Sequence, residues 1–230
     1  MDLSTLPKAD PWAVLPAAPV DPDPSGTPSG EVAYPVDPAG IALYDAPGGE
    51  PFAVLPVEAY KGVTGYPVVA HRDDWLQVMI VARRGLPSVV GKEGVNSATG
   101  WVYGPQTTTS TLDTVIEANP AAGTVSVVTN GQVTASTQAG FGKAATPTPH
   151  ERTFVMSIAA NPEAQYSRLF VYLAAHSPTL DTFGGGPAPI AIHAYSTYSG
   201  QISNGCMRIP ANKLDPFAAV PTGTPVVFVS

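Results

Sequence analysis

Two residues toward the C-terminal end of the chain, His193 and Cys206, have the chemistry of a base and a nucleophile. Cys206 is the only cysteine, so it cannot form a disulfide within the chain, and one cysteine offers no zinc-finger spacing. A thiol attacks as its thiolate, which needs a neighbouring base or a positive dipole. The alternative is that Cys206 is a small buried apolar side chain, a common role for a free cysteine.

The segments around these residues could bring them together. Residues 190–192, Ile-Ala-Ile, are typical of a strand that ends at His193, and residues 203–205, Ser-Asn-Gly, are typical of a turn before Cys206. If the loop between them folds back, His193 can act as the base for the thiol. Papain-like proteases place the cysteine before the histidine, and caspases separate the two by about fifty residues, so neither pattern fits.

Residues 192–194 and 203–208 resemble the signature of L,D-transpeptidase catalytic domains of the YkuD type. In that family the signature runs Ile-His-Gly, a variable loop, then Ser-His-Gly-Cys-Ile/Val-Arg, with Asn in place of the second His in some members. The matching positions are Ser203, Gly205, Cys206 and Arg208, with Asn204 in the variant form and Met207 as an apolar replacement. Ala194 and Tyr195 depart from the usual Gly and Thr or Ser, which puts the shape of the pocket in question.

The resemblance implies a two-step acyl transfer on peptidoglycan stem peptides. Cys206 would attack the meso-diaminopimelate carbonyl of a donor tetrapeptide and expel the terminal D-alanine. The acyl group would then pass to the side-chain amine of a second stem, giving a 3→3 crosslink. His193 would hold Cys206 ionised and then protonate the departing amine. Carbapenem-type β-lactams are expected as covalent inhibitors.

The remaining signature residues have expected supporting roles. Backbone N–H groups of Asn204, Gly205 and Cys206 are candidates for stabilising the oxyanion, and a side chain at Gly205 would block the substrate backbone. Ser203 could orient His193, although a backbone carbonyl could do so equally well. Arg208 could bind a substrate carboxylate or hydrogen-bond carbonyls of the turn. The bulk of Tyr195 would narrow access to the thiol.

Two alternative functions stay open on the sequence alone. Water could resolve the acyl-enzyme, which would make the protein an L,D-carboxypeptidase or endopeptidase. The protein could also be a non-catalytic wall-binding protein. The four histidines and one cysteine offer no metal-ligand set, so no metal or cofactor is implied.

Charge and composition limit the partners and the location. A net charge of −7 gives no basic footprint for nucleic acid, and no apolar run reaches the length of a membrane span. The first residues lack a basic stretch followed by an apolar one, so a secreted protein would be represented here by a mature or trimmed chain. We expect a monomer located outside the cytoplasm, in the cell envelope.

Three segments are expected along the chain. Residues 1–33 are rich in proline and are expected to form an extended linker that buries little surface. Residues 34–110 contain short strand patterns, and their Val-Ala-His-Arg-Asp-Asp-Trp stretch resembles bacterial SH3-like domains. In this segment the pair Arg83-Arg84 is expected in a solvated turn, with a ligand-facing loop as the alternative. The strands are expected at 41–44, 52–55, 66–70, 75–81 and 100–103.

Residues 111–230 are expected to form the catalytic domain. Asn130-Gly131 is a strong hairpin signal between two strand patterns. Residues 140–150 resemble a Gly-Lys-x-x-Thr-Pro-x-Pro segment of the family, a short helix is expected within 211–219, and His176 is expected in an ordinary loop. The predicted fold class is therefore mainly β: a small SH3-like barrel followed by a β-rich YkuD-type domain with one or two short helices. A 111–230 fragment is expected to keep a reactive Cys206 on its own.

Overall fold

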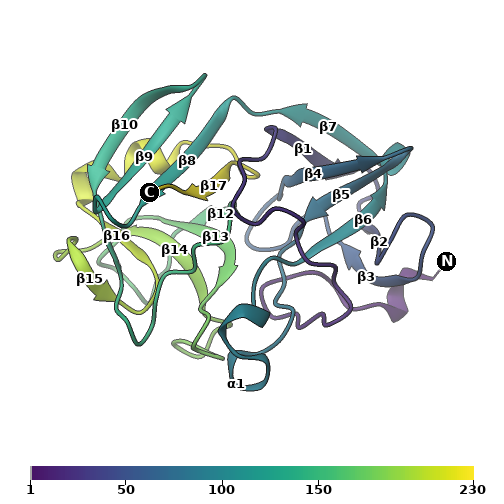
Figure 1. Ribbon diagram of the computed structural model, residues 1–230, viewed down its shortest axis with the longest axis horizontal. Helices are drawn as coiled ribbons and strands as arrows, with labels where there is room; N and C mark the ends of the chain where they lie inside the picture. Colours follow the sequence, from purple (N-terminus) through teal and green to yellow (C-terminus); the bar gives the residue numbers. More distant parts are fainter. Residues whose placement is uncertain (1) are drawn as a thin grey trace.

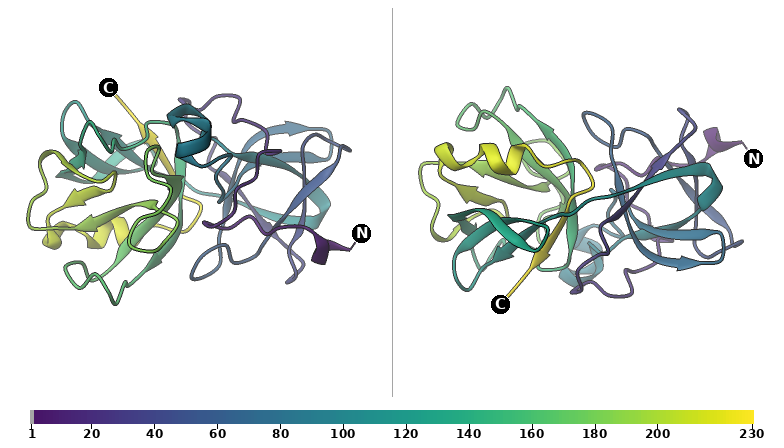
Figure 2. Two further views of the ribbon diagram at one scale, coloured as in Figure 1. Left: turned by 90° about the horizontal axis from the view of Figure 1, so that it is seen from below. Right: turned by 90° about the horizontal axis from the view of Figure 1, so that it is seen from above.

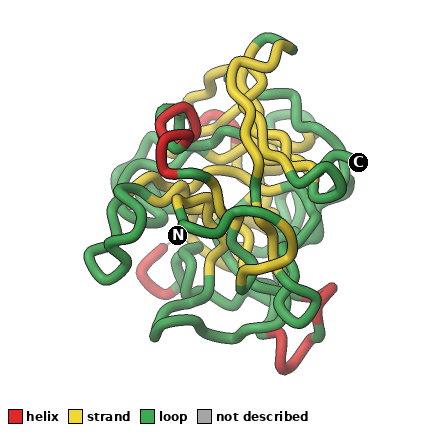
Figure 3. Tube along the Cα trace, turned by 90° about the vertical axis from the view of Figure 1, so that its left-hand side faces the viewer, coloured by secondary structure: helices red, strands yellow, loops and turns green. Residues whose placement is uncertain are grey.

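The computed structural model describes residues 2–230 as two β-sheets lying side by side, with long loops and little helix (Figures 1 and 3). The predicted mainly β fold is confirmed. The first sheet is seven-stranded in the order β3-β2-β6-β5-β4-β1-β7. Its strands are β1 (Glu31–Pro35), β2 (Ile41–Tyr44), β3 (Pro51–Leu55), β4 (Tyr66–Arg72), β5 (Trp75–Met79), β6 (Thr99–Tyr103) and β7 (Thr107–Thr111).

The second sheet is ten-stranded in the order β10-β9-β8-β17-β12-β13-β14-β16-β11-β15. Asn130 and Gly131 turn the chain between β9 and β10, both with positive φ, as the hairpin signal predicted. The strands are β8 (Thr114–Asn119), β9 (Thr124–Thr129), β10 (Gln132–Gln138), β11 (Gly140–Gly142), β12 (Thr153–Ala159), β13 (Phe170–His176), β14 (Pro189–Ala194), β15 (Gly200–Ser203), β16 (Met207–Ile209) and β17 (Pro225–Phe228).

The helical structure is short throughout. The two α-helices are α1 (Pro87–Val90) and α2 (Asp215–Ala218), and the expected helix within 211–219 divides into a 3₁₀ turn at Ala211–Lys213 followed by α2. Within the described residues, no helix has the length and apolar character needed to cross a membrane.

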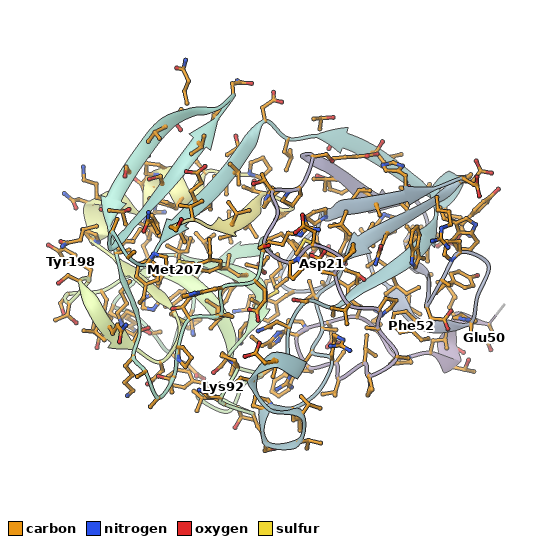
Figure 4. The ribbon with its side chains drawn as sticks, viewed as in Figure 1. Asp21, Glu50, Phe52, Lys92, Tyr198 and Met207 are labelled. Atoms are coloured by element: carbon orange, nitrogen blue, oxygen red, sulfur yellow. The ribbon has the colours of Figure 1, made fainter. Side chains whose placement is uncertain are left out.

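The central strands of the second sheet alternate their side chains between two different cores. Side chains of β-strands point to opposite faces in turn, so each strand can serve two packing surfaces. One face of β12, β13, β14 and β16 packs within the second half of the molecule, through Val155, Val171, Leu173, Ile192 and Met207. Met207 lies inside this half in Figure 4. The opposite face carries Phe154, Met156, Phe170, Tyr172 and Ala191, which cluster with residues of the first half.

The two halves therefore share one hydrophobic core. The same cluster contains buried residues from the first sheet, including Ala33, Leu43, Tyr66, Val68 and Val78. Backbones of the two halves also approach closely, because a Cβ built on Gly223 would lie 3.2 Å from the carbonyl of Gly65. We conclude that the face of the second sheet that carries the candidate site is covered by the first half.

The expectation that residues 1–33 form a segment with little buried surface is wrong. The chain here is extended, but Ala9, Leu15 and Ala18 are buried in the shared core. The segment runs from the outer end of the first half to the junction of the two halves, where Asp21 lies (Figures 2 and 4). Asp21 forms a buried ion pair with Arg152, with Nη2–Oδ1 and Nε–Oδ2 distances of 2.6 and 2.7 Å. Composition alone misses this because the segment buries its apolar side chains against other segments rather than against itself.

Arg83 and His176 also differ from expectation, because both are buried between the halves. Arg83 Nη1 donates to the carbonyl of Asp181 at 2.7 Å, and Arg84 Nε donates to the carbonyl of Ala18, so this pair is not a solvated turn. His176 lies at the end of β13 with its Nε2 2.9 Å from the carbonyl of Pro11. Both residues thus fasten the N-terminal segment and the first half to the second half.

Candidate active site

A cavity of about 460 Å³ opens on the face of the second sheet that meets the first half. Its floor comes from β13 and β14, and the β12–β13 loop forms one side. Most of its lining belongs to the second half, while Tyr60 and Lys61 come from the first. Other lining residues include Asn161, Glu163, Tyr166, Phe170, Tyr172, Ala191, His193, Ser203, Asn204, Cys206 and Arg208.

Strand pairing brings His193 and Cys206 to this cavity. β14 and β16 are parallel neighbours with His193 opposite Arg208, and Cys206 immediately precedes β16. Residues two apart on a strand share a face, so Cys206, Arg208 and His193 face the same side of the sheet. His193 and Cys206 both line the cavity, and no hydrogen bond joins them within residues 2–230.

The ring of His193 is held by a backbone carbonyl. Its Nδ1 lies 3.0 Å from the carbonyl oxygen of Ala194, and only 4% of the residue is exposed. A carbonyl oxygen can only accept, so Nδ1 carries the proton and Nε2 is left with its lone pair. This tautomer is the one that a general base facing a thiol requires.

Burial keeps both candidate groups neutral. It lowers the pKa of His193 to about 4, opposed by the Ala194 carbonyl and assisted by the positive charge of Arg208. Burial also raises the pKa of the Cys206 thiol, while a backbone hydrogen bond with Ala191 and the charge of Arg208 act in the opposite direction. From the sequence we predicted that His193 holds Cys206 ionised, but the two pKa shifts favour a neutral thiol beside a neutral imidazole.

The turn before Cys206 is shaped by Ser203 and Gly205. Ser203 Oγ donates to the carbonyl of Cys206 at 2.6 Å and accepts from the N–H of Gly205 at 3.1 Å. Ser203 therefore fixes the turn, and the Ala194 carbonyl orients His193 instead. Gly205 has a φ of +118°, and a Cβ there would meet Ile190 Cδ1 at 2.8 Å, so glycine is required by the backbone and by packing rather than by substrate approach.

The segment after β11 braces this turn from behind. Thr148 Oγ1 donates to the carbonyl of Gly205 at 2.8 Å and accepts from the N–H of Gly142 at 2.9 Å. Thr146 Oγ1 donates to the carbonyl of Ser203 at 3.1 Å. The resemblance of residues 140–150 to a family segment drew attention to this stretch, but not to the hydroxyls that support the turn.

Arg208 and Tyr195 form a stacked pair beside the cavity. The guanidinium carbon of Arg208 lies 4.0 Å from the ring centre of Tyr195. Arg208 lines the cavity, its Nε is buried without a hydrogen-bond partner, and within residues 2–230 it donates to no carbonyl of the turn. Tyr195 does not line the cavity, so it does not narrow the cleft as the sequence predicted. Its ring supports Arg208 and contacts Tyr166, with centroids 5.0 Å apart.

Tyr166 covers His193 from the β12–β13 loop. Its ring centre lies 5.4 Å from that of His193, while 52% of the residue remains exposed. Phe170 also contacts the imidazole, with centroids 5.0 Å apart, and its ring centre lies 5.8 Å from that of Tyr166. These two aromatic residues exclude water from His193 and account for much of its burial.

The structure brings most of the expected site residues together. The cavity is lined by His193, Ser203, Asn204, Cys206 and Arg208, whereas Gly205 and Tyr195 are outside its lining and contact residues that belong to it. Sequence reasoning missed the aromatic wall of Tyr60, Tyr166, Phe170 and Tyr172, because no motif connects loops and strands so distant in sequence. Within the described residues there is no group of three or more His, Cys, Asp or Glu side chains that could hold a metal ion.

The sequence model of the YkuD L,D-transpeptidase catalytic domain matches residues 113–228, half of the 230-residue chain. The chain belongs to the YkuD L,D-transpeptidase family. The match covers the whole second half, including β14, the Ser203–Cys206 turn and the segment that braces it. The resemblance inferred from the short signature is thereby confirmed at the level of the family, while the SH3-like resemblance of the first half stays a prediction. No curated protein matches the chain significantly.

The solved structures to which the chain is similar include L,D-transpeptidases. A crystal structure from Enterococcus faecium is 21% identical, with a TM-score of 0.37, and covers 51% of this chain and 50% of its own. This chain thus spans about half the length of that relative. An X-ray structure from Mycobacterium tuberculosis is 14% identical, with a TM-score of 0.46, and covers 89% of this chain and 100% of its own. The E. faecium catalytic domain acylated by ertapenem is 21% identical, with a TM-score of 0.38, and covers 52% of this chain and 99% of its own.

Proposed function

We propose that this family member is a peptidoglycan L,D-transpeptidase that forms 3→3 crosslinks through a Cys206 acyl-enzyme. The observation that supports it most is the pairing, in one cavity, of the only thiol with an imidazole whose Nδ1 is fixed by the Ala194 carbonyl. That arrangement leaves Nε2 as the proton acceptor. A buried neutral imidazole has its Nε2 lone pair available at neutral pH, and its lowered pKa means that it accepts the proton only as the sulfur attacks.

The first half-reaction is acylation of Cys206. As its Sγ bonds to the meso-diaminopimelate carbonyl carbon of the donor stem, the thiol proton passes to Nε2 of His193. Because the resting pair is neutral, this transfer accompanies the attack rather than preceding it. When the tetrahedral intermediate collapses, the bond to D-alanine breaks and His193 returns the proton to the departing amine.

The second half-reaction transfers the acyl group to an acceptor. The side-chain amine of a second stem attacks the thioester carbonyl, His193 accepts its proton, and the sulfur leaves and regains that proton. The oxyanion of both steps needs backbone donors. The N–H of Gly205 is already donated to Ser203 Oγ, which leaves the N–H groups of Asn204 and Cys206 as the proposed donors.

Arg208 is proposed to bind the carboxylate of the departing D-alanine. Its guanidinium lies two residues from the nucleophile, lines the cavity and has a buried Nε without a partner. A carboxylate would provide that partner in a charge-assisted hydrogen bond. This activity also places the protein, as part of the proposal, outside the cytoplasm in the cell envelope.

Intact-protein mass spectrometry tests the proposal directly. Incubation with ertapenem, and separately with a tetrapeptide stem, should add one acyl group to the wild type and none to Cys206→Ala. Because Cys206 is the only thiol, label that persists in the variant would overturn the assignment. Adding an acceptor stem should convert the acyl-enzyme into a crosslinked product, whereas release of the free acid alone would favour the carboxypeptidase alternative.

A further inference from the structure

The loop 56–65 between β3 and β4 forms one wall of the candidate active site. Among the described residues, 2–230, Tyr60 and Lys61 on this loop are the only lining residues from the first half of the chain. The ring of Tyr60 meets that of Tyr172 edge to face, with centroids 5.2 Å apart. Tyr172 belongs to β13, where it lies opposite Ala191, the residue whose backbone contacts the Cys206 thiol. The first half therefore reaches the immediate surroundings of the nucleophile.

Hydrogen bonds to the second half hold this loop in place. Thr64 Oγ1 donates to the carbonyl of Met156 at 3.2 Å, and Ser157 Oγ donates to the carbonyl of Lys61 at 3.4 Å. Thr222 Oγ1 donates to the carbonyl of Val63 at 3.0 Å. Because three contacts of this kind join the loop to β12 and to the 221–224 turn, the wall keeps its position relative to the cavity floor.

Lys61 brings a positive charge that has no acidic partner in the part of the chain that the structure describes. Its Nζ lies 5.1 Å from the ring centre of Tyr60 and 5.4 Å from that of Tyr172, so the ammonium contacts both rings of this edge-to-face pair. None of the ion pairs within residues 2–230 involves Lys61, and its side chain is exposed to the cavity opening. An ammonium placed in this way is ready to bind an anionic group of a ligand.

The charge of the cavity differs from that of the whole protein. The chain has 18 acidic and 11 basic residues, but the cavity is lined by two cations, Lys61 and Arg208, and one anion, Glu163. We propose that Lys61 determines specificity by binding a carboxylate of the stem peptide that lies away from the reacting carbonyl. Arg208, close to Cys206, binds the carboxylate next to the scissile bond. This inference rests on the proposed function and adds the first half of the chain to the substrate site.

Two tetrapeptide probes test the proposal with the full-length protein. One is L-Ala-γ-D-Glu-meso-diaminopimelyl-D-Ala, and in the other both carboxyl groups remote from the scissile bond are carboxamides. Lys61→Gln should lower kcat/KM for the first peptide about five- to tenfold, mainly through KM, because one exposed charge contact is lost. The same variant should leave kcat/KM for the amidated peptide unchanged. Lys61→Arg should retain most of the wild-type value, because it keeps the charge and the stacking.

Matched measurements separate this role from a structural one. Lys213→Gln removes an exposed charge outside the cavity and should change neither rate. Raised salt should reduce the wild-type preference for the carboxylate peptide and have little effect on Lys61→Gln. An equal fall for both peptides, or no fall, would overturn the role of Lys61 alone. If the wild type forms no acyl-enzyme with either peptide, the proposed function fails and the inference fails with it.

Discussion

His193 and Cys206 differ from a preformed thiolate–imidazolium pair. Burial lowers the pKa of the first to about 4 and raises that of the second, so each favours its neutral form at neutral pH. Attack must then be coupled to proton transfer, which ties reactivity to a substrate that places its carbonyl near both groups. A small reagent without that carbonyl gains little from His193.

The pH dependence of thiol alkylation tests this neutral resting state. The iodoacetamide rate should rise continuously with pH and show no plateau between about pH 5 and 8, because a raised thiol pKa leaves little thiolate in that range. N-acetylcysteine serves as the unperturbed control and should react faster at each neutral pH. A plateau beginning near pH 5 would mean that an ion pair exists in the free enzyme.

Tyr195 offers a second test, because the structure changes the role expected for it. The ring supports the Arg208 guanidinium at 4.0 Å rather than filling the cavity. Tyr195→Leu should therefore slow acylation by a carbapenem, by about two- to fivefold for a loss of about 0.5–1 kcal/mol of cation–π stabilisation. Tyr195→Phe keeps the aromatic face and should behave like the wild type. Faster acylation by Tyr195→Leu would restore the view that this ring narrows the cleft.

The Ser203–Cys206 turn depends on its brace from the segment after β11. Thr148 joins the two by donating to the carbonyl of Gly205 and accepting from the N–H of Gly142, and it is buried. Neither group has an obvious replacement partner, so losing the hydroxyl leaves buried polar groups unsatisfied.

Thr148→Val should consequently lower stability by about 1–3 kcal/mol. It should also reduce acylation more than stability alone explains, because the turn that carries Cys206 loosens. Thr148→Ser keeps the hydroxyl and should retain most of both properties. Urea unfolding and ertapenem acylation rates measure the two effects, and wild-type values for Thr148→Val would mean that the brace is dispensable.

Local sequence patterns predict the strands with alternating or continuous apolar runs, such as β2 at Ile41–Tyr44, but not those with other compositions. β7, Thr-Thr-Thr-Ser-Thr, has no apolar alternation, and the stretch 104–111 reads as a join between domains. It becomes a strand because it pairs along its full length with β1, from Glu31–Thr111 to Pro35–Thr107. Pairing partners so far apart in sequence are not encoded in any local window.

The residues of the candidate site likewise fall into those that local sequence reveals and those that it does not. His193 and Cys206 follow from residue type and spacing, because a contiguous motif carries them. Lys61 and Thr148 could not be found by that route, since each acts through contacts with residues dozens of positions away. The burial of the N-terminal segment could not be predicted from its composition either, because its apolar residues pack against side chains of other segments.

The whole molecule behaves as one packed unit rather than as two independent modules. Phe154, Met156 and Tyr172 lie on the sheet face that the first half covers. Burying a side chain of this size stabilises by about 1.5–3 kcal/mol. Exposing several of them would remove a large part of a typical total stability of about 5–15 kcal/mol. The earlier expectation that residues 111–230 keep a reactive Cys206 alone is therefore revised.

An isolated 111–230 fragment should be strongly destabilised and prone to aggregation, and its Cys206 should not be acylated by ertapenem. The control is full-length protein with a protease site inserted between Leu112 and Asp113. After cleavage, the two pieces should stay together in gel filtration and keep acylation. A soluble fragment with wild-type acylation would show that the shared core is not needed for the site.

Acid should weaken the junction at His176, where three parts of the chain meet. Its ring contacts the carbonyl of Pro11, and the Asn96 side chain hydrogen-bonds to both its N–H and its carbonyl. Burial, assisted by the nearby charge of Arg83, lowers the pKa of His176 to about 4. An unfolded histidine titrates near pH 6.5, so the unfolded state takes up the proton first as pH falls. The stabilisation is complete above about pH 6.5 and is lost as pH falls toward 4, by about 3 kcal/mol.

Urea unfolding between pH 4 and 7 measures this loss. His176→Gln keeps a side-chain N–H that can reach the Pro11 carbonyl but cannot titrate, so its stability should depend less on pH over that range. His193 has a similarly lowered pKa and still contributes in the variant, so about half of the acid sensitivity should remain. Identical curves for His176→Gln and the wild type would show that the junction does not sense protonation of His176.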